Sequence, residues 1–387
     1  MKVNTLPQKI ILTIYDPEVS QLIERLKARD DFKALRLQQL LALPDLTRTE
    51  HSPIEILVDA VLRLSRFEDF DVIEVPEIVS VKNNFDLLNA PMDHVSRKET
   101  DTYYLEPGWL LRTQTTVMWP FYLTEEKKKQ LEEKGEVGAL CYGKVYRKDE
   151  IDRSHYPVFH QIDGLYITKK SKKIIGIPEL TEVLVDIAKQ IYGPNVEYHI
   201  LKDSFPFTDP SIEVGIKWND EWLEILGAGV VHTQVLKNLG IDPEEYNGWA
   251  FGFGLERLAM IKMEIPDIRI FWSKDPRITS QFKDLNSKFK EVSKYPMTYR
   301  DISFVVGKDM NMNNYYEIIR SCAGDLVEKV ELLDKYENTE KFGEDKISYT
   351  FRTVYRSHER TLTNDEVNAI HAQIQKRTEE EFKAVVR

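Results

Sequence analysis

The sequence predicts an α+β protein built in two parts. Its 387 residues exceed one average domain, and a hydrophobic content of 42% is enough for a sizeable core. From residue 53 to residue 282, strand patterns follow one another with few helices between them, which is typical of a mostly antiparallel sheet. From residue 286 onward the predicted order changes to βαββαβ, which is the ferredoxin-like pattern.

Residues 1–52 have helical periodicity and show no recognisable chemistry. Leucines recur at helical spacing, among them Leu22, Leu26 and Leu37, and Pro44 ends the pattern. We therefore predict a helical N-terminal appendage over residues 1–52.

Residues 53–285 form the larger predicted domain. It opens with an amphipathic helix that has Pro53 in its first turn, followed by a strand pattern that Pro76 interrupts, as suits an edge or an interface. Two strands are also predicted within residues 145–167. The other predicted elements are strands at 109–119, 197–207, 211–219, 221–231 and 248–254 and helices at 124–135, 178–193 and 255–264.

Residues 286–387 form the second predicted domain. A capping box of Thr363 and Glu366 opens its last helix. In its third strand Tyr349 and Phe351 fall on one face and Arg352 on the other, as in a half-buried sheet. The predicted elements are strands at 301–307, 327–338, 346–356 and 384–387 and helices at 313–324 and 363–382.

The composition excludes several classes of protein. A net charge of −11 argues against a protein that coats nucleic acid indiscriminately, although residues 286–387 are nearly neutral, with 17 Lys and Arg against 18 Asp and Glu. No run of about 18 apolar residues is present, so no membrane span is expected. Acids at Asp16 and Glu18 argue against a transit peptide. Cys141 and Cys322 are isolated, as expected for buried thiols in a reducing compartment.

The stretch from residue 145 to residue 167 is the strongest candidate for a binding site. It carries Arg147 and a loop dense in charge that includes His155. Strand alternation places Gln161 and Asp163 on one face, where an amide beside a carboxylate suits a ligand better than a core. The alternative is a solvated hairpin.

Two further pieces of sequence point to phosphate chemistry. A glycine-rich strand leads into a helix with Arg257 in its first turn, although a tight packing turn would have the same pattern. Glu224 shares a strand face with Trp222 and Leu226, where a carboxylate needs a cation or a metal as partner. Two arginines and separate carboxylates suit a phosphate chain with Mg²⁺, as in nucleotidyl or acyl-adenylate chemistry.

Several ordered motifs resemble those of a known family. VIEVPEI, YRKDE…HYPVFHQ and GFGLERLAM resemble motifs 1, 2 and 3 of class II aminoacyl-tRNA synthetases. LLRTQTT, DSFPFTDPS, WLEILGAG and GWAFGFGLER are similar to the phenylalanine-specific members, and YRSHERTLTNDEVN to their ferredoxin-like anticodon-binding domain. With both parts in one chain, the sequence resembles the single-chain, organellar-type enzyme.

The resemblance implies how ATP is bound. Arg147 would clamp the α-phosphate and the amino-acid carboxylate, and Arg257 would bind the γ-phosphate and cover the adenine. Phe159 would stack on the other side of the adenine, and Glu224 would bind Mg²⁺. The other residues implied to contact ATP are Ser154, His155, Tyr156 and Glu256.

The resemblance also implies the amino-acid pocket. Phe205 and Phe207 would meet the substrate ring edge-to-face, and Ala250 with Phe251 would line the pocket floor. Without the motif, these aromatic side chains would equally suit a core. The residues implied to hold the amino group are Gln161, Asp163 and Thr116, with Gln114 and Trp119 as looser contacts.

The chain departs from the family pattern at three of these positions. The family usually has Glu at Asp163, His at Gln114 and Ser at Thr116, and all three changes preserve hydrogen-bonding capacity. No segment resembles the family's separate editing domain. An apolar pocket rejects an added hydroxyl only weakly, so we predict mischarging with tyrosine and no proofreading in cis.

The leading hypothesis is ATP-dependent attachment of phenylalanine to its tRNA through a phenylalanyl-adenylate. The expected partners are phenylalanine and the acceptor end and anticodon region of tRNA, with no membrane. A monomer is favoured, and a homodimer or second subunit stays open. A cytoplasmic location is expected, with a mitochondrial or other organelle matrix as the alternative. The competing functions are a non-catalytic paralogue that binds tRNA or an amino acid, and a class II relative that ligates another amino acid.

Overall fold

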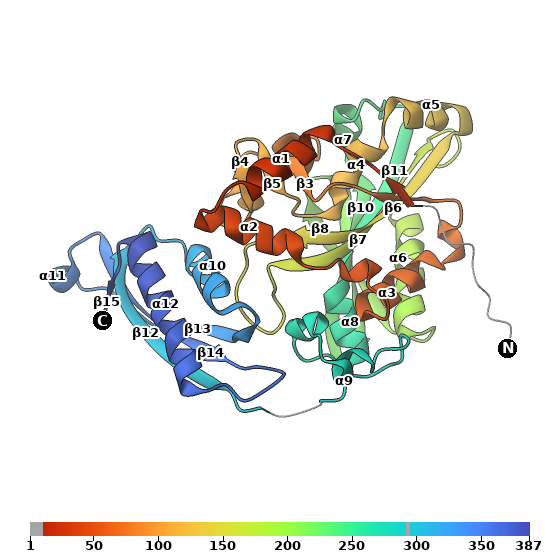
Figure 1. Cartoon of the computed structure of the whole chain (residues 1–387). Coiled ribbons are helices and arrows are strands. Elements are labelled where there is room, and N and C mark those ends of the chain that lie inside the picture. The colour runs from red at the N-terminus through yellow and green to blue at the C-terminus, as the bar shows by residue number, and fades with distance from the viewer. Residues whose placement is uncertain (1–10, 292–294) are drawn as a thin grey trace. The chain divides into compact units, whose positions relative to one another are not determined.

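The computed structural model describes residues 11–291 and 295–387, and the chain divides into two compact units (Figure 1). We call them unit 1 and unit 2. Unit 1 consists of Met1–Tyr146, Val158–Glu264 and Phe282–Lys288, and unit 2 of Arg147–Pro157, Ile265–Gln281 and Phe289–Arg387.

Unit 1 contains an eight-stranded sheet in the order β1-β2-β6-β7-β11-β10-β9-β8. All pairs from β6 to β8 are antiparallel, whereas β1–β2 and β2–β6 are parallel. The predicted mostly antiparallel sheet is therefore confirmed. Its strands are β1 Ile11–Thr13, β2 Asp71–Glu74, β6 Glu136–Tyr146, β7 Val158–Lys169, β8 Tyr198–Phe205, β9 Thr208–Trp218, β10 Glu221–Val231 and β11 Tyr246–Gly254.

Helices pack against this sheet and one another in unit 1. Helices α3 and α8 pack together, α6 packs on β9 and β10, and α8 packs on β7. Residues 1–10 of the predicted helical appendage lie outside the described residues, and the remainder contains strand β1 as well as two helices. The helices α1 and α2 are separate because Asp31 caps a new helix by accepting from the Ala34 N–H at 3.1 Å. The helices of unit 1 are α1 Pro17–Lys27, α2 Phe32–Ala42, α3 Pro53–Leu62, α4 Met118–Tyr122, α5 Glu125–Lys134, α6 Ile177–Tyr192, α7 Thr233–Asn238 and α8 Leu255–Met263.

Two predicted strands of unit 1 are shorter than expected. The pattern around Pro76 divides into β2 and β3 (Ile78–Ser80), which belong to different sheets, because proline has no N–H for a continuous ladder. The pattern over residues 109–119 forms only β5 (Trp109–Leu111), which joins β3 and β4 (Tyr104–Glu106) in a small sheet. Thr115–Val117 is instead a short 3-10 helix.

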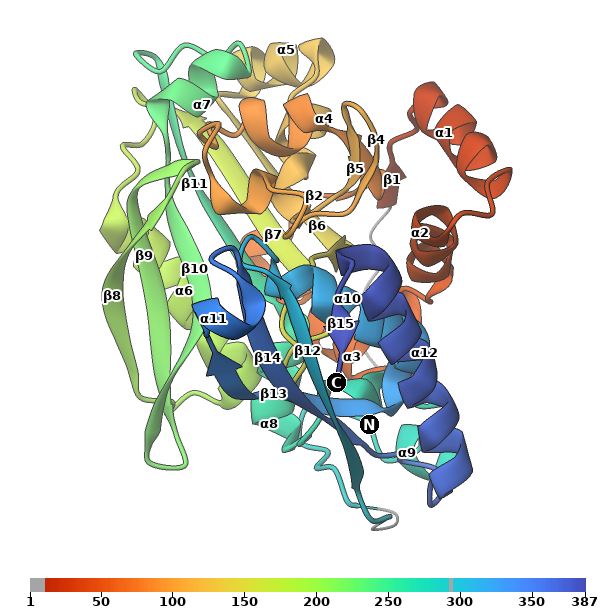
Figure 2. The same cartoon turned by 90° about the vertical axis from the view of Figure 1, so that its left-hand side faces the viewer.

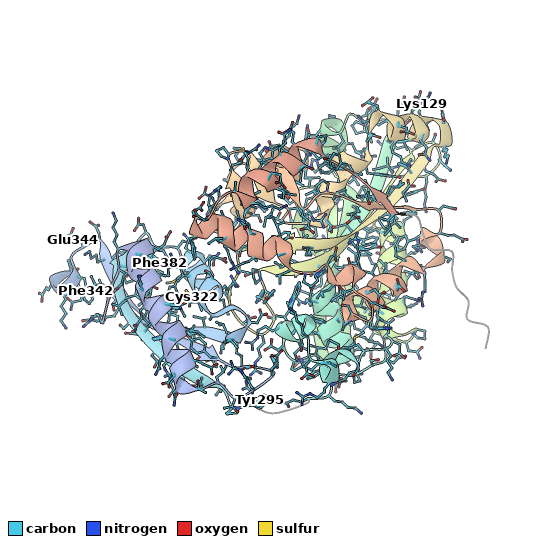
Figure 3. All side chains as sticks on the ribbon, viewed as in Figure 1. Lys129, Tyr295, Cys322, Phe342, Glu344 and Phe382 are labelled. Atoms are coloured by element: carbon cyan, nitrogen blue, oxygen red, sulfur yellow. The ribbon has the colours of Figure 1, made fainter. Side chains whose placement is uncertain are left out.

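Unit 2 contains the ferredoxin-like fold that the sequence predicts. Its four strands have the order β13-β14-β12-β15, all antiparallel, and α10 and α12 lie side by side (Figure 2). Phe304, Tyr315 and Phe351 form the centre of the core, against which Cys322 and Phe382 pack (Figure 3). The elements are α9 Pro276–Thr279, β12 Thr298–Gly307, α10 Met312–Ala323, β13 Val327–Tyr336, α11 Thr339–Phe342, β14 Lys346–Tyr355, α12 Asn364–Phe382 and β15 Val385–Val386.

Candidate active site

The hairpin of β6 and β7 lies near the middle of the eight-stranded sheet, between β2 and β11. Gly143 lies opposite Gln161 and Cys141 opposite Asp163 across the antiparallel pair. Because side chains alternate along a strand, Gln161 and Asp163 point to the same face of the sheet. The prediction of two strands joined by a long polar loop is confirmed, and the loop is Arg147–Pro157.

The Asp163 carboxylate is buried and held by two hydroxyl groups. The side chain of Thr115 donates to Asp163 Oδ2 at 2.7 Å, and that of Thr116 donates to Oδ1 at 3.1 Å. Gly252 lies opposite on β11, and a Cβ atom there would come within 2.2 Å of Asp163 Oδ1. Glycine therefore leaves room for the carboxylate. Hydroxyl donors stabilise the ionised form of a buried carboxylate, which can then bind a cationic group.

The 3-10 turn explains why sequence reasoning missed Thr115. A strand would have pointed Thr115 and Thr116 to opposite faces, whereas the tight turn directs both hydroxyl groups at Asp163. The same turn places the Thr115 N–H within 3.3 Å of Gln161 Oε1, so that amide also belongs to the cluster. The side-chain amide of Gln114 donates to the Asn84 carbonyl at 3.3 Å.

Aromatic side chains adjoin this turn. Phe205 and Phe207 flank the tight connection between β8 and β9, and their rings stack at 5.9 Å with an interplanar angle of 5°. Phe207 also meets Trp119 edge-to-face at 5.8 Å. Trp119 is buried in the core that includes Ala250, and Phe207 packs against that core. Phe205, Phe207 and Trp119 thus meet on the face of the sheet that carries Asp163.

One predicted pocket residue lies elsewhere. Ala250 shares the core with Trp119, whereas Phe251 pairs with Gly164 on the opposite face of the sheet. There the Phe251 ring lies 5.8 Å from that of Phe67, and a Cβ atom at Gly164 would come within 2.3 Å of it. The prediction that Phe251 lines the pocket is therefore wrong, because consecutive strand residues point in opposite directions.

Carboxylates gather on the outer strands of the same sheet. Burial raises the pKa of Glu213, and the nearby carboxylates of Glu224 and Asp203 raise it further, while Arg257 lowers it. Glu213 lies two residues after Ser211, the last residue of the DSFPFTDPS motif. The sequence alone predicted no role for it. Among the described residues no three His, Cys, Asp or Glu side chains are arranged to hold a metal by themselves. A cation here would therefore need phosphate oxygens as further ligands, as Mg²⁺ commonly does.

The surroundings of Glu224 differ from those predicted. A bulge between Glu224 and Leu226 shifts the register, so that Leu226 is buried while Glu224 is exposed. Trp222 is also exposed and stacks on His199 at 4.1 Å. The expectation of a carboxylate between two large apolar side chains is therefore wrong. Glu224 is instead a solvent-exposed carboxylate whose charge acts on the neighbouring Glu213.

Two neighbouring side chains in the first turn of α8, Glu256 and Arg257, differ in exposure. Arg257 is exposed, whereas Glu256 is buried at 2% exposure. Both Glu256 oxygens accept from the His160 N–H, at 3.0 and 2.8 Å, and Oε1 is 2.6 Å from His160 Nδ1. The Glu256 carboxylate is therefore buried and joins α8 to β7. The prediction that Glu256 contacts ATP is wrong, because its oxygens are not accessible.

The loop Arg147–Pro157 belongs to unit 2. His155 Nδ1 lies 2.8 Å from Asp152, whose carboxylate raises the pKa of His155, and Ser154 donates to the same carboxylate at 2.9 Å. Tyr156 stacks on Trp272 at 5.4 Å. The predicted ATP residues are therefore divided: Arg147, Ser154, His155 and Tyr156 lie in unit 2, and Phe159, Glu224, Glu256 and Arg257 in unit 1.

An ion-pair cluster holds the loop within unit 2. The Glu328 carboxylate accepts from Arg153 and from Arg356, the latter at 2.6 Å. Burial would raise the pKa of Glu328, but the two guanidinium groups outweigh it and lower the pKa. Arg153, which has no role in the motif resemblance, is thus a structural partner of the C-terminal fold.

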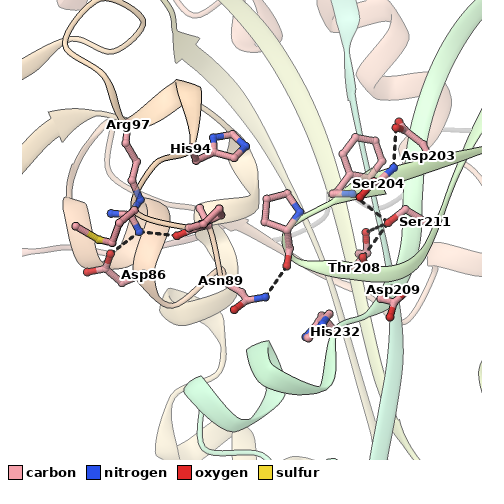
Figure 4. A pocket seen from close by; sticks show the side chains of 15 residues that line it. Asp86, Asn89, His94, Arg97, Asp203, Ser204, Thr208, Asp209, Ser211 and His232 are labelled. Atoms are coloured by element: carbon pink, nitrogen blue, oxygen red, sulfur yellow. Dashed lines mark hydrogen bonds and ion pairs between the residues drawn. The ribbon is translucent and has the colours of Figure 1, made fainter.

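A cavity of about 840 Å³ opens beside Phe205 in unit 1 (Figure 4). Arg97 forms one side, where it pairs with Asp86 at 2.6 Å and donates to the Ala90 carbonyl at 2.7 Å. No feature of the sequence around these residues indicates a cavity. The other polar side chains at this cavity are Asn89, His94, Asp203, Ser204, Thr208, Asp209, Ser211 and His232.

Comparison with protein families finds two matches along the chain. Residues 40–282 match the family described as tRNA synthetases class II core domain (F), and residues 293–387 match the ferredoxin-fold anticodon binding domain. The chain therefore belongs to the class II aminoacyl-tRNA synthetases.

Three similar proteins are named as ligases for phenylalanine. The chain is 39% identical to "Phenylalanine--tRNA ligase, chloroplastic/mitochondrial" of Arabidopsis thaliana, over 88% of this chain and 80% of the relative. It is 38% identical to "Probable phenylalanine--tRNA ligase, mitochondrial" of Drosophila melanogaster, over 80% and 77%. It is 31% identical to "Phenylalanine--tRNA ligase, mitochondrial" of Saccharomyces cerevisiae, over 100% and 99%. These organellar names give no support to the predicted cytoplasmic location.

Proposed function

We propose that this protein activates phenylalanine with ATP and transfers it to tRNA. The observation that carries the proposal is the buried Asp163 carboxylate, which lies on the same sheet face as the Phe205, Phe207 and Trp119 cluster. A carboxylate in an otherwise apolar site suits the ammonium group of an amino acid. Stacked and edge-on aromatic rings suit an aromatic side chain of the same substrate.

The amino-acid end of the site binds with groups that are already in place. Asp163 would pair with the substrate ammonium, and Gln161 would add its amide. Thr116 would act by holding Asp163, and Gln114, which donates to Asn84, would serve the turn more than the substrate. Because these groups are held by the fold, the substrate does not have to order them on binding.

The phosphate end is proposed for the acidic face of β9 and β10 together with Arg257. Glu224 and Glu213 fit Mg²⁺, which takes one or two protein carboxylates alongside phosphate oxygens. The metal would neutralise phosphate charge when bound. Arg257 would bind the γ-phosphate, and Phe159 would stack on the adenine. The role of Arg147 at the α-phosphate stays a prediction, because Arg147 belongs to unit 2.

The proposed reaction has two steps. A carboxylate oxygen of phenylalanine attacks the α-phosphorus of ATP, a P–O bond breaks, and pyrophosphate leaves. A ribose hydroxyl at the end of the tRNA then attacks the carbonyl carbon of the adenylate, loses its proton, and displaces AMP. Neither step needs a protein nucleophile, so positioning and positive charge supply most of the rate enhancement.

Unit 2 is proposed to contact the anticodon region of tRNA. On the face of its sheet away from Phe304 and Phe351, Arg352 lies 4.1 Å over the exposed ring of Tyr299. Aromatic and arginine side chains on an open sheet face can stack on unpaired bases. Binding through such a face and through basic groups should weaken as salt rises.

A charging assay tests the proposed function directly. Purified protein, ATP, Mg²⁺ and radioactive phenylalanine are incubated with tRNA, and acid-precipitable phenylalanine is counted. We expect charging that disappears when the terminal ribose of the tRNA is oxidised with periodate. Absence of charging with intact tRNA would support a non-catalytic paralogue and overturn the proposal.

Tyrosine provides a test of selectivity. We propose that the aromatic site rejects tyrosine only through the cost of burying a hydroxyl group, which gives about 10²-fold discrimination. Tyrosyl-tRNA prepared separately should then persist when it is incubated with this protein. Its enzymatic hydrolysis would contradict the prediction that the chain does not proofread.

The described structure also favours a monomer. Strand β1 pairs with β2 at one edge of the large sheet, so the edge of the strand before Pro76 is covered within the chain. No helix among residues 11–291 and 295–387 is long and apolar enough to cross a membrane. We propose a monomer in an organelle matrix, to be tested by light scattering and by cell fractionation. A stable dimer would contradict the first part.

A further inference from the structure

His160 is a fully buried imidazole that the proposed reaction does not use. It follows Phe159 on β7 and has 0% exposure. Its Nδ1 atom lies 2.6 Å from Glu256 Oε1, and its Nε2 atom accepts the backbone N–H of Leu46 at 3.0 Å. One ring therefore joins three segments: the residues before α3, strand β7, and the first turn of α8.

These contacts determine the tautomer of His160. Because Leu46 donates to Nε2, that nitrogen must carry a lone pair, and the ring proton is on Nδ1. The Nδ1 proton is then donated to the Glu256 carboxylate. Glu256 also accepts the His160 backbone N–H, so its two oxygens are fixed against β7. The next residue along the helix is Arg257.

The segment that supplies Leu46 is itself anchored to β6. Lys144, which is buried, donates to the carbonyl oxygens of Leu41 at 3.0 Å and Leu43 at 2.7 Å. Asp45 accepts from the Thr47 N–H at 2.9 Å and pairs with Arg48. Burial would raise the pKa of Asp45, but Arg48 and the other partners outweigh it, and the pKa is lowered. Residues 41–48 are therefore a fixed part of unit 1.

We propose that His160 is a positioning residue for ATP binding, acting through Glu256 on Arg257, and that the Leu46 N–H sets its tautomer. The N-terminal segment, to which the sequence assigns no role, thereby contributes to the phosphate end of the active site. The match to the synthetase core family begins at residue 40, so it includes the segment that contains Leu46. The inference rests on the proposed role of Arg257 in ATP binding.

Two substitutions of His160 separate its contacts. In His160→Asn the amide nitrogen can take the place of Nδ1 and donate to Glu256, while the Leu46 N–H loses its acceptor. In His160→Gln the longer amide can accept from Leu46, while Glu256 loses its side-chain donor. We expect His160→Gln to weaken ATP binding about tenfold, and His160→Asn to weaken it less, with no change in phenylalanine binding.

The backbone donor can be removed as well. Leu46 is the first residue of a 3-10 turn, and Asp45 before it is extended, with φ −82° and ψ 105°. Proline is accepted at such a position and has no N–H. Leu46→Pro should weaken ATP binding, whereas Leu46→Val, which loses similar packing but keeps the N–H, should not. Equal effects of the two substitutions would overturn the role of this donor.

The closing experiment is a double-mutant cycle measured by calorimetry of ATP binding to the full chain. If His160 acts through Arg257, His160→Gln should weaken ATP binding in the wild type and have no further effect in Arg257→Ala. Additive effects, or no effect in a folded single variant, would overturn the inference. Because the readout is ATP alone, it is independent of amino-acid choice. A wild-type protein that binds no ATP would overturn the proposed function, and the inference with it.

Discussion

The two ends of the proposed active site in unit 1 are constructed differently. At the amino-acid end, Asp163 is 3% exposed, and each of its oxygens already accepts a hydrogen bond from threonine. At the phosphate end, Glu224 and Arg257 are exposed, and carboxylates lie close enough to raise the pKa of Glu213. The hydrogen bonds of the first end are already in place, whereas we propose that Mg²⁺ and phosphate balance the charges of the second. We therefore propose that the first end determines specificity and the second stabilises charge.

The largest expected effect is at the phosphate end. Arg257→Ala should lower amino-acid-dependent ATP–pyrophosphate exchange by about 10²–10³-fold, because it removes a charge that stabilises the transferring phosphates. The melting temperature should stay the same, since Arg257 is exposed. Arg63→Ala, at an exposed arginine after α3, is the matched control. Undiminished exchange in Arg257→Ala would contradict the proposed role of Arg257 in the active site.

The next effect should be confined to the amino-acid end. Asp163→Asn keeps the size of the side chain and removes its charge, so kcat/KM for phenylalanine should fall by about 10- to 100-fold. The KM for ATP should not change. Thr116→Ser, which keeps the hydroxyl donor to Asp163, is the control. If Asp163→Asn raised both KM values equally, the separation between the two ends would be incorrect.

A backbone substitution tests the same carboxylate indirectly. Gly252→Ala would place a Cβ atom 2.2 Å from Asp163 Oδ1 and displace the carboxylate. We expect the KM for phenylalanine to rise about tenfold. Gly254→Ala is a control two residues away, where a Cβ atom would meet nothing within 4 Å. Similar kinetics for the two variants would show that the room beside Asp163 is not needed.

The smallest expected effect concerns charge repulsion at Glu213. Burial and the neighbouring carboxylates raise its pKa in the folded state, so the folded state binds this proton more tightly than the unfolded state. The free energy of unfolding therefore falls as pH rises from the ordinary glutamate pKa through the raised value. Glu213→Gln removes this loss, and the melting temperature near pH 7 should rise by about 1 °C. Glu221→Gln, at an exposed position, is the control and should not change the melting temperature. Binding of Mg²⁺·ATP should weaken in Glu213→Gln and not in Glu221→Gln.

Sequence periodicity predicted most of the strands that carry these residues. Alternation along β7 correctly placed Gln161 and Asp163 on one face, and the βαββαβ order predicted every element of the ferredoxin-like sheet. These predictions succeeded because regular strands impose a period of two, and the pattern of burial follows it. The same rule, applied consistently to β11, would have excluded Phe251 from the pocket.

Irregular backbone was the source of the other differences. The bulge after Glu224 and the 3-10 turn at Thr115 each change where a side chain points, and neither has a distinctive local sequence. The partners of Glu256 and Leu46 are distant in sequence, because His160 joins residues that are 96 and 114 positions away. Such contacts follow only from the three-dimensional arrangement, so the sequence alone predicts no contact between the N-terminal segment and the active site.

The central claim is that the amino-acid end selects phenylalanine for activation by ATP. ATP–pyrophosphate exchange with each of the twenty amino acids in turn tests it most directly, because it needs no tRNA and reports only the first step. The account predicts fast exchange with phenylalanine, much slower exchange with tyrosine, and background rates with the remainder. Faster exchange with any other amino acid, or no exchange at all, would contradict it.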